Sequence, residues 1–180
     1  AANQIALNLS SMTFMIAVGL GVTATVRVGN QKGLKNYKEL RRIAISIILL
    51  MIVIDLFFAF GFIMAKDILP TMYIDNVEVI ETAAVLIVIS GFFQLSDGIQ
   101  VVVLGALRGL QDVKWPMLIT FIAYWIIGFP ICYYLALHTS LAEKGIWIGL
   151  LISLTASAIM LYIRFNKLTH KLIREKHGTS

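Results

Sequence analysis

Long apolar runs, separated by short polar segments, dominate the chain. A helix needs about 20 largely apolar residues to cross a bilayer, and five segments reach this length. They cover approximately residues 3–28, 43–65, 82–107, 116–137 and 145–165. The pattern therefore predicts an all-α membrane protein with five transmembrane helices.

Two features of these segments bear on helix shape and packing. Pro116 suits the first turn of the fourth helix, where its missing N–H is not needed, whereas Pro130 lies in the interior and is expected to kink that helix. Small residues recur at packing spacing in the third and fifth helices: Gly98, Gly105, Gly109, Gly145, Gly149, Ser153 and Ser157. Such positions let membrane helices approach closely, so they predict a tight bundle.

The segments between the apolar runs alternate in charge. The first connection, the third connection and the C-terminal tail together hold thirteen Lys and Arg residues, whereas the second and fourth connections hold two. By the positive-inside rule, the basic side lies in the cytoplasm. We therefore expect a multi-pass protein of the inner cell membrane with a cytoplasmic C-terminus. Arg27 and Arg108, at helix ends on this side, are predicted to anchor the interface.

The same pattern predicts how the chain is divided. Residues 1–165 would form the membrane bundle, and residues 166–180 a basic cytoplasmic tail that lies along the surface or frays. The chain begins with Ala1, not Met, and its first segment is already apolar. It is therefore expected to be a piece of a longer protein.

Composition supports a membrane protein and argues against other classes. Hydrophobic residues make up 59% of the chain and charged residues 14%, whereas soluble domains carry about 25% charged residues. The net charge of +5 comes from basic membrane flanks, which attract anionic lipid, so the lipid bilayer is the expected partner and nucleic acid is not. No Cys/His cluster has zinc spacing, and no catalytic triad or phosphate loop is present. Neither an enzyme nor a cofactor is expected.

Asp97 is the most informative polar residue. A carboxylate in the middle of a membrane helix costs about 2.5–3.5 kcal/mol on insertion scales, and such acids usually mark an ion pathway. On a helix turning about 100° per residue, Asp97 shares one face with Ser90, Phe93, Gln94 and Gln100. This polar face predicts a lined cavity in which Asp97 exchanges a proton or pairs with Na⁺. The alternative is a buried, protonated Asp97 that bonds a neighbouring helix.

The first predicted helix carries a second polar face. Gln4, Asn8, Ser11 and Met15 are spaced so that they lie on one side of the helix. They could touch a substrate, coordinate a cation or contact Asp97, or they could only form interhelical hydrogen bonds. Asp55 is the other acid within a predicted span. Apolar residues occupy the positions three and four away from it, which favours a structural role or a partner on a helix outside the chain.

The order of these features resembles the C-terminal half of the multidrug and toxic compound extrusion (MATE) family, in particular its NorM-like members. The first part of the match is AANQIALNLSSMTFMIAVGLGVTATVRVGNQKG, which is similar to the family's eighth helix and following loop. The second is FFQLSDGIQVVVLGALRGLQDVKWP, which resembles the tenth helix and its exit. The resemblance spans all 180 residues and implies helices eight to twelve of twelve. These would form most of the C-terminal six-helix bundle, facing an N-terminal bundle of the same full-length chain.

The resemblance also implies a function. Family members export organic cations or other amphiphilic, drug-like compounds in exchange for Na⁺ or H⁺ by alternating access. Asp97 matches the tenth-helix acid of the family's cation site, with Phe93 and Gln94 beside it, and Na⁺ at Asp97 is the one metal ion implied. A Glu of the seventh helix, outside this chain, would be its partner acid.

Two positions depart from the family pattern. Phe93 stands where NorM-like proteins often have Tyr, and Ala17 replaces a Pro common in the eighth helix. Two other functions are alternatives: a lipid-linked oligosaccharide flippase of the same superfamily, and a non-transporting membrane scaffold subunit. No Lys or Arg lies in the middle of a span, which argues against the flippase.

Overall fold

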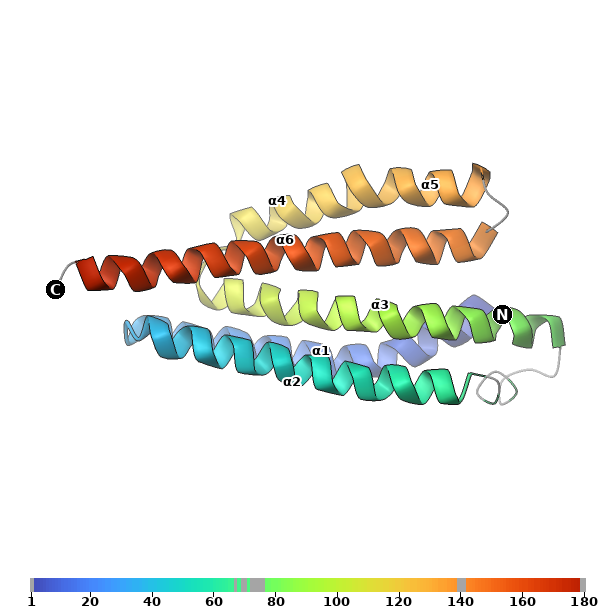
Figure 1. Cartoon of the computed structure of the whole chain (residues 1–180), viewed down its shortest axis with the longest axis horizontal. Coiled ribbons are helices and arrows are strands. Elements are labelled where there is room, and N and C mark those ends of the chain that lie inside the picture. Colours follow the sequence, from blue (N-terminus) through green and yellow to red (C-terminus); the bar gives the residue numbers. More distant parts are fainter. Residues whose placement is uncertain (1, 67, 69–70, 72–76, 139–141, 179–180) are drawn as a thin grey trace.

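Five long helical segments run side by side in the structure, a computed structural model in which residues 2–66, 68, 71, 77–138 and 142–178 are described (Figure 1). They are α1 (Ala2–Gly33), α2 (Tyr37–Met64), α3 (Val77–Gly109), a fourth segment, and α6 (Ala142–Gly178). The fourth segment consists of α4 (Lys114–Phe121), the π-helix η2 (Ile122–Gly128) and α5 (Phe129–His138). All five are long and apolar enough to cross a membrane, so the predicted helices are confirmed.

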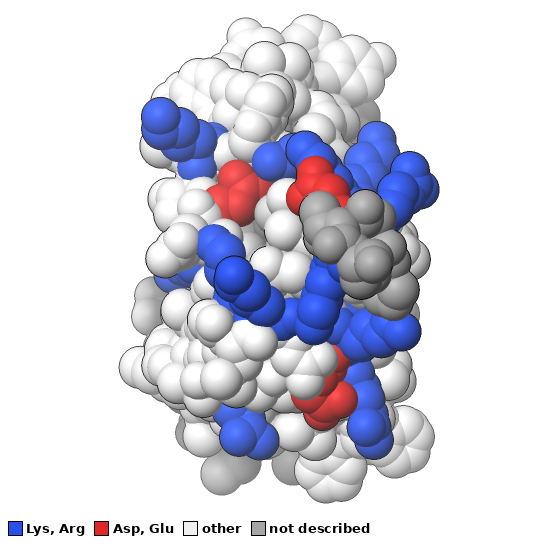
Figure 2. Space-filling view, turned by 90° about the vertical axis from the view of Figure 1, so that its left-hand side faces the viewer, with Lys and Arg blue, Asp and Glu red and all other residues white. Residues whose placement is uncertain are grey.

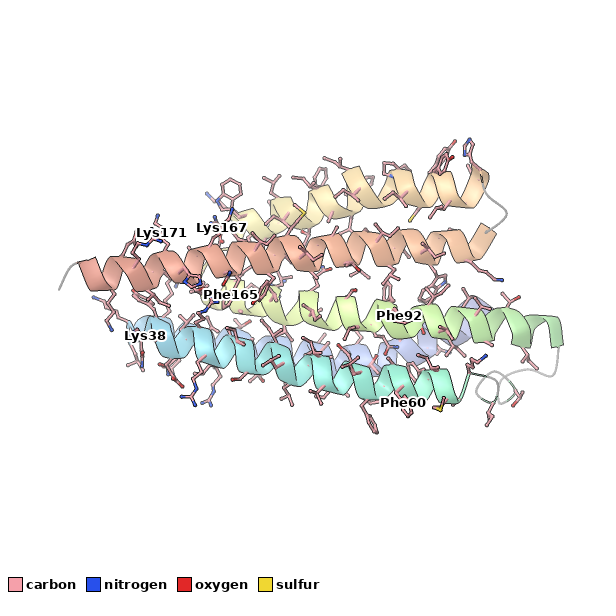
Figure 3. All side chains as sticks on the ribbon, in the orientation of Figure 1. Lys38, Phe60, Phe92, Phe165, Lys167 and Lys171 are labelled. Carbon is pink, nitrogen blue, oxygen red and sulfur yellow. The ribbon has the colours of Figure 1, made fainter. Side chains whose placement is uncertain are left out.

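Successive helices run in opposite directions, so that charge separates between the two ends of the bundle. The turn from α1 to α2, the turn from α3 to α4 and the C-terminal end of α6 lie at one end (Figure 1). Figure 2 views this end and shows Lys and Arg side chains spread across it. Lys38, Lys167 and Lys171 all lie here (Figure 3). The predicted gathering of the basic connections and the tail on one side is confirmed.

The C-terminal tail differs from the expectation that it would fray or lie on a surface. The helix α6 continues through it as far as Gly178. Two residues in this stretch make contacts that explain its order. Thr169 is fully buried and accepts a hydrogen bond from Arg41 Nη1 at 3.0 Å, and Lys176 Nζ donates to the carbonyl oxygen of Lys35 at 2.9 Å. The tail is therefore held against the start of α2.

The two turns at the basic end share one backbone geometry. Lys35 and Gln111 both have positive φ values, of 54° and 60°. In each turn the next residue donates its N–H to a carbonyl five residues earlier, from Asn36 to Gln31 at 3.0 Å and from Asp112 to Leu107 at 3.0 Å. This is the Schellman arrangement that ends helices, with Lys and Gln at the left-handed position where Gly is usual. Each turn therefore reverses the chain within a few residues.

Glycines allow α1 and α3 to pack with their backbones in contact. A side chain at Gly105 would meet the carbonyl oxygen and carbon of Gly21, and one at Gly109 would meet the carbonyl oxygen of Thr25 at 2.6 Å. The closeness also lets the Thr25 hydroxyl donate to the Gly105 carbonyl oxygen at 2.9 Å. Close approach of small residues is how membrane helices gain packing energy without a hydrophobic driving force.

The last two segments pack in the same way. Gly145 lies against Leu135, and Gly149 lies against Cys132, whose Cα is 2.9 Å from the position a side chain would take. Ser153 packs on Gly128. The small residues that predicted a tight bundle are therefore found at its helix contacts.

The expected disturbance at Pro130 appears as the π-helix η2, which ends two residues before it. In this segment the N–H of Phe129 reaches back five residues to the carbonyl of Tyr124. Proline has no N–H for the turn before it, and its ring would collide with the carbonyl four residues earlier in an α-helix. A wider turn accommodates both effects. Pro116, as predicted, lies in the first turn of α4.

The apolar side chains divide into a buried set and an outward set. Phe165 is fully buried in the core that joins α1, α2, α3 and α6. Phe60 and Phe92 are 65% and 55% exposed on the outside of the bundle (Figure 3). Exposed apolar faces of this kind suit a protein surrounded by lipid.

Candidate functional site

A cavity of about 200 Å³ lies between α1, α2 and α3, at mid-depth in the bundle. Its polar lining comes from all three helices. Gln94 and Asp97 belong to α3, Asp55 belongs to α2, and the hydroxyls of Ser10, Ser11 and Thr13 belong to α1. The close contact between α1 and α3 described above positions two of these three walls.

The α3 wall holds the residues predicted to bind a cation. Phe93, Gln94 and Asp97 all line the cavity, because Asp97 follows Phe93 by four residues and Gln94 by three, and positions at these spacings are neighbours on a helix. Gln94 is 4% exposed, and its side-chain nitrogen lies 3.5 Å from Ser10 Oγ. Its carbonyl oxygen Oε1 is buried and has no hydrogen-bond partner among the described residues. Its capacity to accept a hydrogen bond is therefore unused among the described residues.

The aromatic ring of Phe93 has a definite support. It packs edge-on against Trp147 of α6, with ring centroids 5.6 Å apart. Trp147 itself is 5% exposed. The position where the resemblance implied a Tyr hydroxyl therefore offers an apolar wall, and the cation ligands must come from the other lining residues.

Asp55 was not among the predicted site residues, yet its side chain lines the same cavity. It is 1% exposed, and its Oδ2 atom has no hydrogen-bond partner among the described residues. The carboxyl group rests against Gly98, where a side chain would collide with Oδ2. The signal that could have found it is its occurrence as an acid inside a membrane span, because its own helix carries no polar neighbours.

Only part of the predicted polar face of α1 lines the cavity. Ser11 lines the cavity, and its hydroxyl donates to the carbonyl oxygen of Asn8 at 2.7 Å. Gln4 and Asn8 are exposed and bond each other, with Gln4 Nε2 3.3 Å from Asn8 Oδ1. Met15 is 73% exposed. These three residues lie outside the lining of the cavity, on the surface of α1.

Two predicted residues of α3 are engaged elsewhere. Ser90 is fully buried, and its hydroxyl donates to the carbonyl oxygen of Ile87 at 2.8 Å. Gln100 is 8% exposed and accepts a hydrogen bond from the hydroxyl of Tyr124 at 3.0 Å. Neither lines the cavity, although both lie on the same helix as Asp97.

The basic residues predicted to anchor the interface are placed away from the cavity. Arg27 and Arg108 are both exposed, near the ends of α1 and α3. A different arginine, Arg164, joins two elements at this end. Arg164 Nε donates to Asp112 Oδ2 at 2.8 Å, and its guanidinium lies 5.2 Å from the centre of the Trp115 ring. This pair joins the α3–α4 turn to α6.

The donor set of the cavity defines the chemistry it can support. Carboxylate, amide and hydroxyl oxygens are hard ligands that suit small hard cations, and a carboxyl in a desolvated site also carries a proton. The described lining includes no Lys or Arg. No group of three or more His, Cys, Asp or Glu capable of holding a metal ion occurs in the described part of the chain. The cavity thus favours a single positive charge over an anion or a transition metal.

Comparisons with known proteins identify the family. The MatE family profile matches residues 1–134. The chain is 40% identical over 168 residues to the multidrug resistance protein MdtK of Proteus mirabilis, covering 91% of this chain and 37% of that protein. It is 39% identical over 173 residues to the probable multidrug resistance protein NorM of Rhodopseudomonas palustris, covering 94% of this chain and 36% of that protein. The chain thus spans a little over a third of these relatives' length.

Solved structures show the same arrangement of helices. The eukaryotic MATE transporter AtDTX14 matches with a TM-score of 0.84 at 20% identity, over 97% of this chain and 40% of that one. An outward-facing multidrug resistance MATE transporter matches with a TM-score of 0.86 at 14% identity, over 96% of this chain and 39% of that one. An inward-facing one matches with a TM-score of 0.80 at 15% identity, over 94% and 39%. With the five-helix fold, the family profile and relatives near 40% identity in agreement, the chain belongs to the MATE family of transporters.

Proposed function

We propose that the chain is part of a multidrug efflux antiporter, which exports organic cations or other amphiphilic compounds in exchange for Na⁺ or H⁺ by alternating access. The observation that carries the proposal is Asp97, an acid at mid-depth in a membrane helix that lines a cavity with Gln94. Acids at this depth are costly and mark ion pathways. The relatives named above as multidrug resistance proteins support the choice of substrate class.

In this proposal Asp97 couples movement of the cation or proton to movement of the drug, by a change of its charge. A cation or proton occupies Asp97 in one conformation, and drug binding in the other conformation competes with it, directly or through helix rearrangement. A ligand shifts a conformational equilibrium only when it binds the two states differently. A carboxylate that is neutralised in one state supplies such a difference. Gln94 contributes an amide oxygen and Phe93 the apolar wall.

The exposed polar face of α1 supports a second element, the drug pathway. Gln4, Asn8 and Met15 point away from the rest of the described bundle. Amide side chains are unfavourable in lipid because nothing there satisfies their hydrogen bonds. We infer that this face lines the central cavity of the whole transporter, opposite an N-terminal bundle of the same protein. Ser90 and Gln100, buried at helix contacts, have a packing role in this arrangement.

The charge at the two ends supports an orientation. The end that holds the α1–α2 and α3–α4 turns and the end of α6 carries most of the Lys and Arg residues (Figure 2). By the positive-inside rule, we infer that this basic end faces the cytoplasm, with the protein in a bacterial inner membrane. Alternating access then involves movement of this bundle relative to its partner bundle. Structural similarity to both an outward-facing and an inward-facing transporter is consistent with a bundle that keeps its fold during that movement.

The proposal is tested with Asp97→Asn in the full-length protein, reconstituted into liposomes. Dye efflux is measured under a Na⁺ gradient and, separately, under a proton gradient. A hydrogen bond to a charged group contributes about 1.5–3 kcal/mol, so we expect coupled efflux to fall about 10-fold or more under the gradient that drives the wild type. The gradient that drives efflux by the wild type identifies the coupling ion.

Glu39→Gln is the matched control. Glu39 is a surface acid whose Oε2 lies 3.6 Å from Arg42 Nη1 at the basic end, away from the cavity. It should leave efflux at the wild-type rate. Normal efflux by Asp97→Asn at normal expression would contradict the assignment of Asp97.

A further inference from the structure

Asp55 is the buried acid that the proposed coupling mechanism leaves without a role. It lies in the apolar middle of α2, 1% exposed, with Met51 beside it and the cavity in front of it. Its Oδ2 atom has no hydrogen-bond partner among the described residues. A buried carboxylate without a partner is strongly unfavourable. A carboxyl group in such a place is therefore expected to have a ligand that the described residues do not provide.

Gly98 brings this carboxyl group close to Asp97. A side chain at Gly98 would collide with Asp55 Oδ2 and would come within 2.8 Å of Met51 Cε. The absence of a side chain lets the α2 carboxyl reach the backbone of α3 next to Asp97. The two carboxyl groups are near enough to interact electrostatically. Asp55 and Asp97 are therefore neighbours across the α2–α3 contact and line one cavity.

Two neighbouring carboxylates in a desolvated site cannot both carry an uncompensated charge. Either a proton or a metal cation must reduce the repulsion between them. The rest of the lining suits one such charge. Gln94 Oε1 is a buried oxygen with no partner in the described structure, and hydroxyls of Ser11 and Thr13 lie on the opposite wall. Two residues on different helices, each with an unpartnered, buried oxygen, thus line the same small cavity.

Other ionisable groups around the pair do not supply this charge. No Lys, Arg or His lies among the cavity-lining residues that the structure describes. The hydroxyl of Tyr124, in the fourth segment, is neutral and donates to Gln100. The described lining therefore contains no side chain that compensates the charge of the two acids, and a cation or proton can do so.

We propose that Asp55 and Asp97 together bind one monovalent cation, a Na⁺ ion or a proton, so that Asp55 is a second acidic ligand of the coupling site. This inference rests on the proposed transport function and adds a residue of α2 to it. The site then spans α2 and α3, which pack together at Gly98.

The inference is tested on the purified full-length protein by measuring cation binding directly. Isothermal titration with NaCl at constant ionic strength reports Na⁺ binding. Proton release into a weakly buffered solution, upon addition of Na⁺ or of a transported dye, reports the proton. Replacing one carboxylate by a neutral amide should weaken Na⁺ binding about 10-fold to 100-fold, as loss of supporting groups does at metal sites, or should reduce proton release to a comparable extent. We expect Asp55→Asn and Asp97→Asn to give similar losses.

The double variant Asp55→Asn/Asp97→Asn distinguishes a shared site from two separate effects. If the acids hold one cation between them, the double variant should be no weaker than the worse of the two single variants. Independent, multiplying losses would overturn the inference. Wild-type cation binding by Asp55→Asn, at wild-type thermal stability, would also overturn it.

Two glycines on α3 provide a matched test that removes no charge. Gly98→Ala should displace the Asp55 carboxyl and weaken cation binding, whereas Gly91→Ala adds a methyl group 3.5 Å from Cα and Cβ of Ala59, an ordinary contact. Both variants change the same helix face toward α2. Equal cation binding by the two would count against a role for Asp55.

Stability separates the proposed role from a structural one. Asp55→Asn removes a buried acid that lacks a protein partner, so its melting temperature should stay equal to that of the wild type or rise. Ser157→Ala is the control for loss of a buried polar group, because Ser157 Oγ is also buried without a partner among the described residues and lies on α6 away from the cavity. It should leave cation binding unchanged. A large fall in melting temperature for Asp55→Asn alone would indicate that the carboxyl is structural and overturn the inference.

Failure of the inference and failure of the transport proposal give different results. If the wild type does not move dye under any gradient but its cation binding depends on both acids, the transport proposal fails and the shared site stands. If the wild type transports and Asp97→Asn does not, while Asp55→Asn binds cation and transports normally, the transport proposal stands and the shared site fails.

Discussion

The contact between α1 and α3 predicts that a single methyl group will separate these helices. In Gly105→Ala, the added Cβ would lie 2.9 Å from the carbonyl carbon of Gly21 and 3.0 Å from its Cα. These are backbone atoms, so no side chain can rotate to make room. The hydrogen bond from the Thr25 hydroxyl to the Gly105 carbonyl, now 2.9 Å long, would lengthen as the helices moved apart.

The size of the effect follows from three contributions. Overpacking a close contact costs about 1–3 kcal/mol, and loss of an interhelical hydrogen bond in a membrane costs about 0.6 kcal/mol. Against these, Ala is favoured over Gly inside a helix by about 0.5–1 kcal/mol. Gly19→Ala is the matched control, because nothing lies within 4 Å of the position of its Cβ. It should show only the favourable helical contribution, which both variants share, so the two variants should differ by about 1.6–3.6 kcal/mol.

The measurement is unfolding of the full-length protein in mixed micelles with increasing denaturing detergent, followed by circular dichroism. Gly105→Ala should unfold at lower detergent fraction than the wild type, and Gly19→Ala at an equal or higher one. Dye efflux should also fall in Gly105→Ala, because α1 and α3 form two walls of the cavity. If both alanine variants unfolded together, the backbone contact between α1 and α3 would not contribute as described.

Three further predictions concern the basic end and the fourth segment. Arg164 Nε and Asp112 Oδ2 are 2.8 Å apart and largely shielded from solvent. A double-mutant cycle on Arg164→Gln and Asp112→Asn should therefore give a coupling energy of about 0.5–3 kcal/mol in unfolding experiments. Additive losses would show that the pair is not coupled. Lys35 has a φ of 54°, and a non-glycine residue at positive φ is strained. Lys35→Gly should therefore raise the unfolding free energy by up to about 1–2 kcal/mol. A fall in unfolding free energy would contradict this. Tyr124→Phe removes the 3.0 Å bond to Gln100 and should lower the unfolding free energy by about 0.6–1.5 kcal/mol; an unchanged value would show that this bond makes no net contribution.

Hydrophobic runs and charge alternation were enough to predict the architecture. Each is a property of sequence alone, since a bilayer demands length and apolarity from a helix and sorts Lys and Arg by side. The polar face of α3 was visible for the same reason: Phe93, Gln94 and Asp97 are spaced along one helix, and helical periodicity brings them together. The structure places all three in one cavity lining.

Asp55 could not be placed by the same reasoning. Periodicity describes neighbours on one helix, whereas Asp55 lies against α3, which its carboxyl group reaches only because Gly98 has no side chain. The length of α6 was also missed, because the tail is polar by composition and is held as a helix by tertiary contacts, including the bond from Arg41 to Thr169. Contacts between distant segments account for both differences.

The π-helix η2 has a consequence for the length of the fourth segment. Each N–H in such a turn reaches back five residues instead of four, so the turn accommodates one residue more than an α-helix would. One residue corresponds to about 100° of rotation. In α5, Cys132 and Leu135 meet Gly149 and Gly145 of α6, and the added residue sets the angle at which they do so. Deleting one residue within 122–128 would convert the wide turn into an ordinary one and change that angle, whereas α4 upstream would keep its own contacts. The rotation of α5 about the axis of the fourth segment can therefore change while that of α4 stays the same.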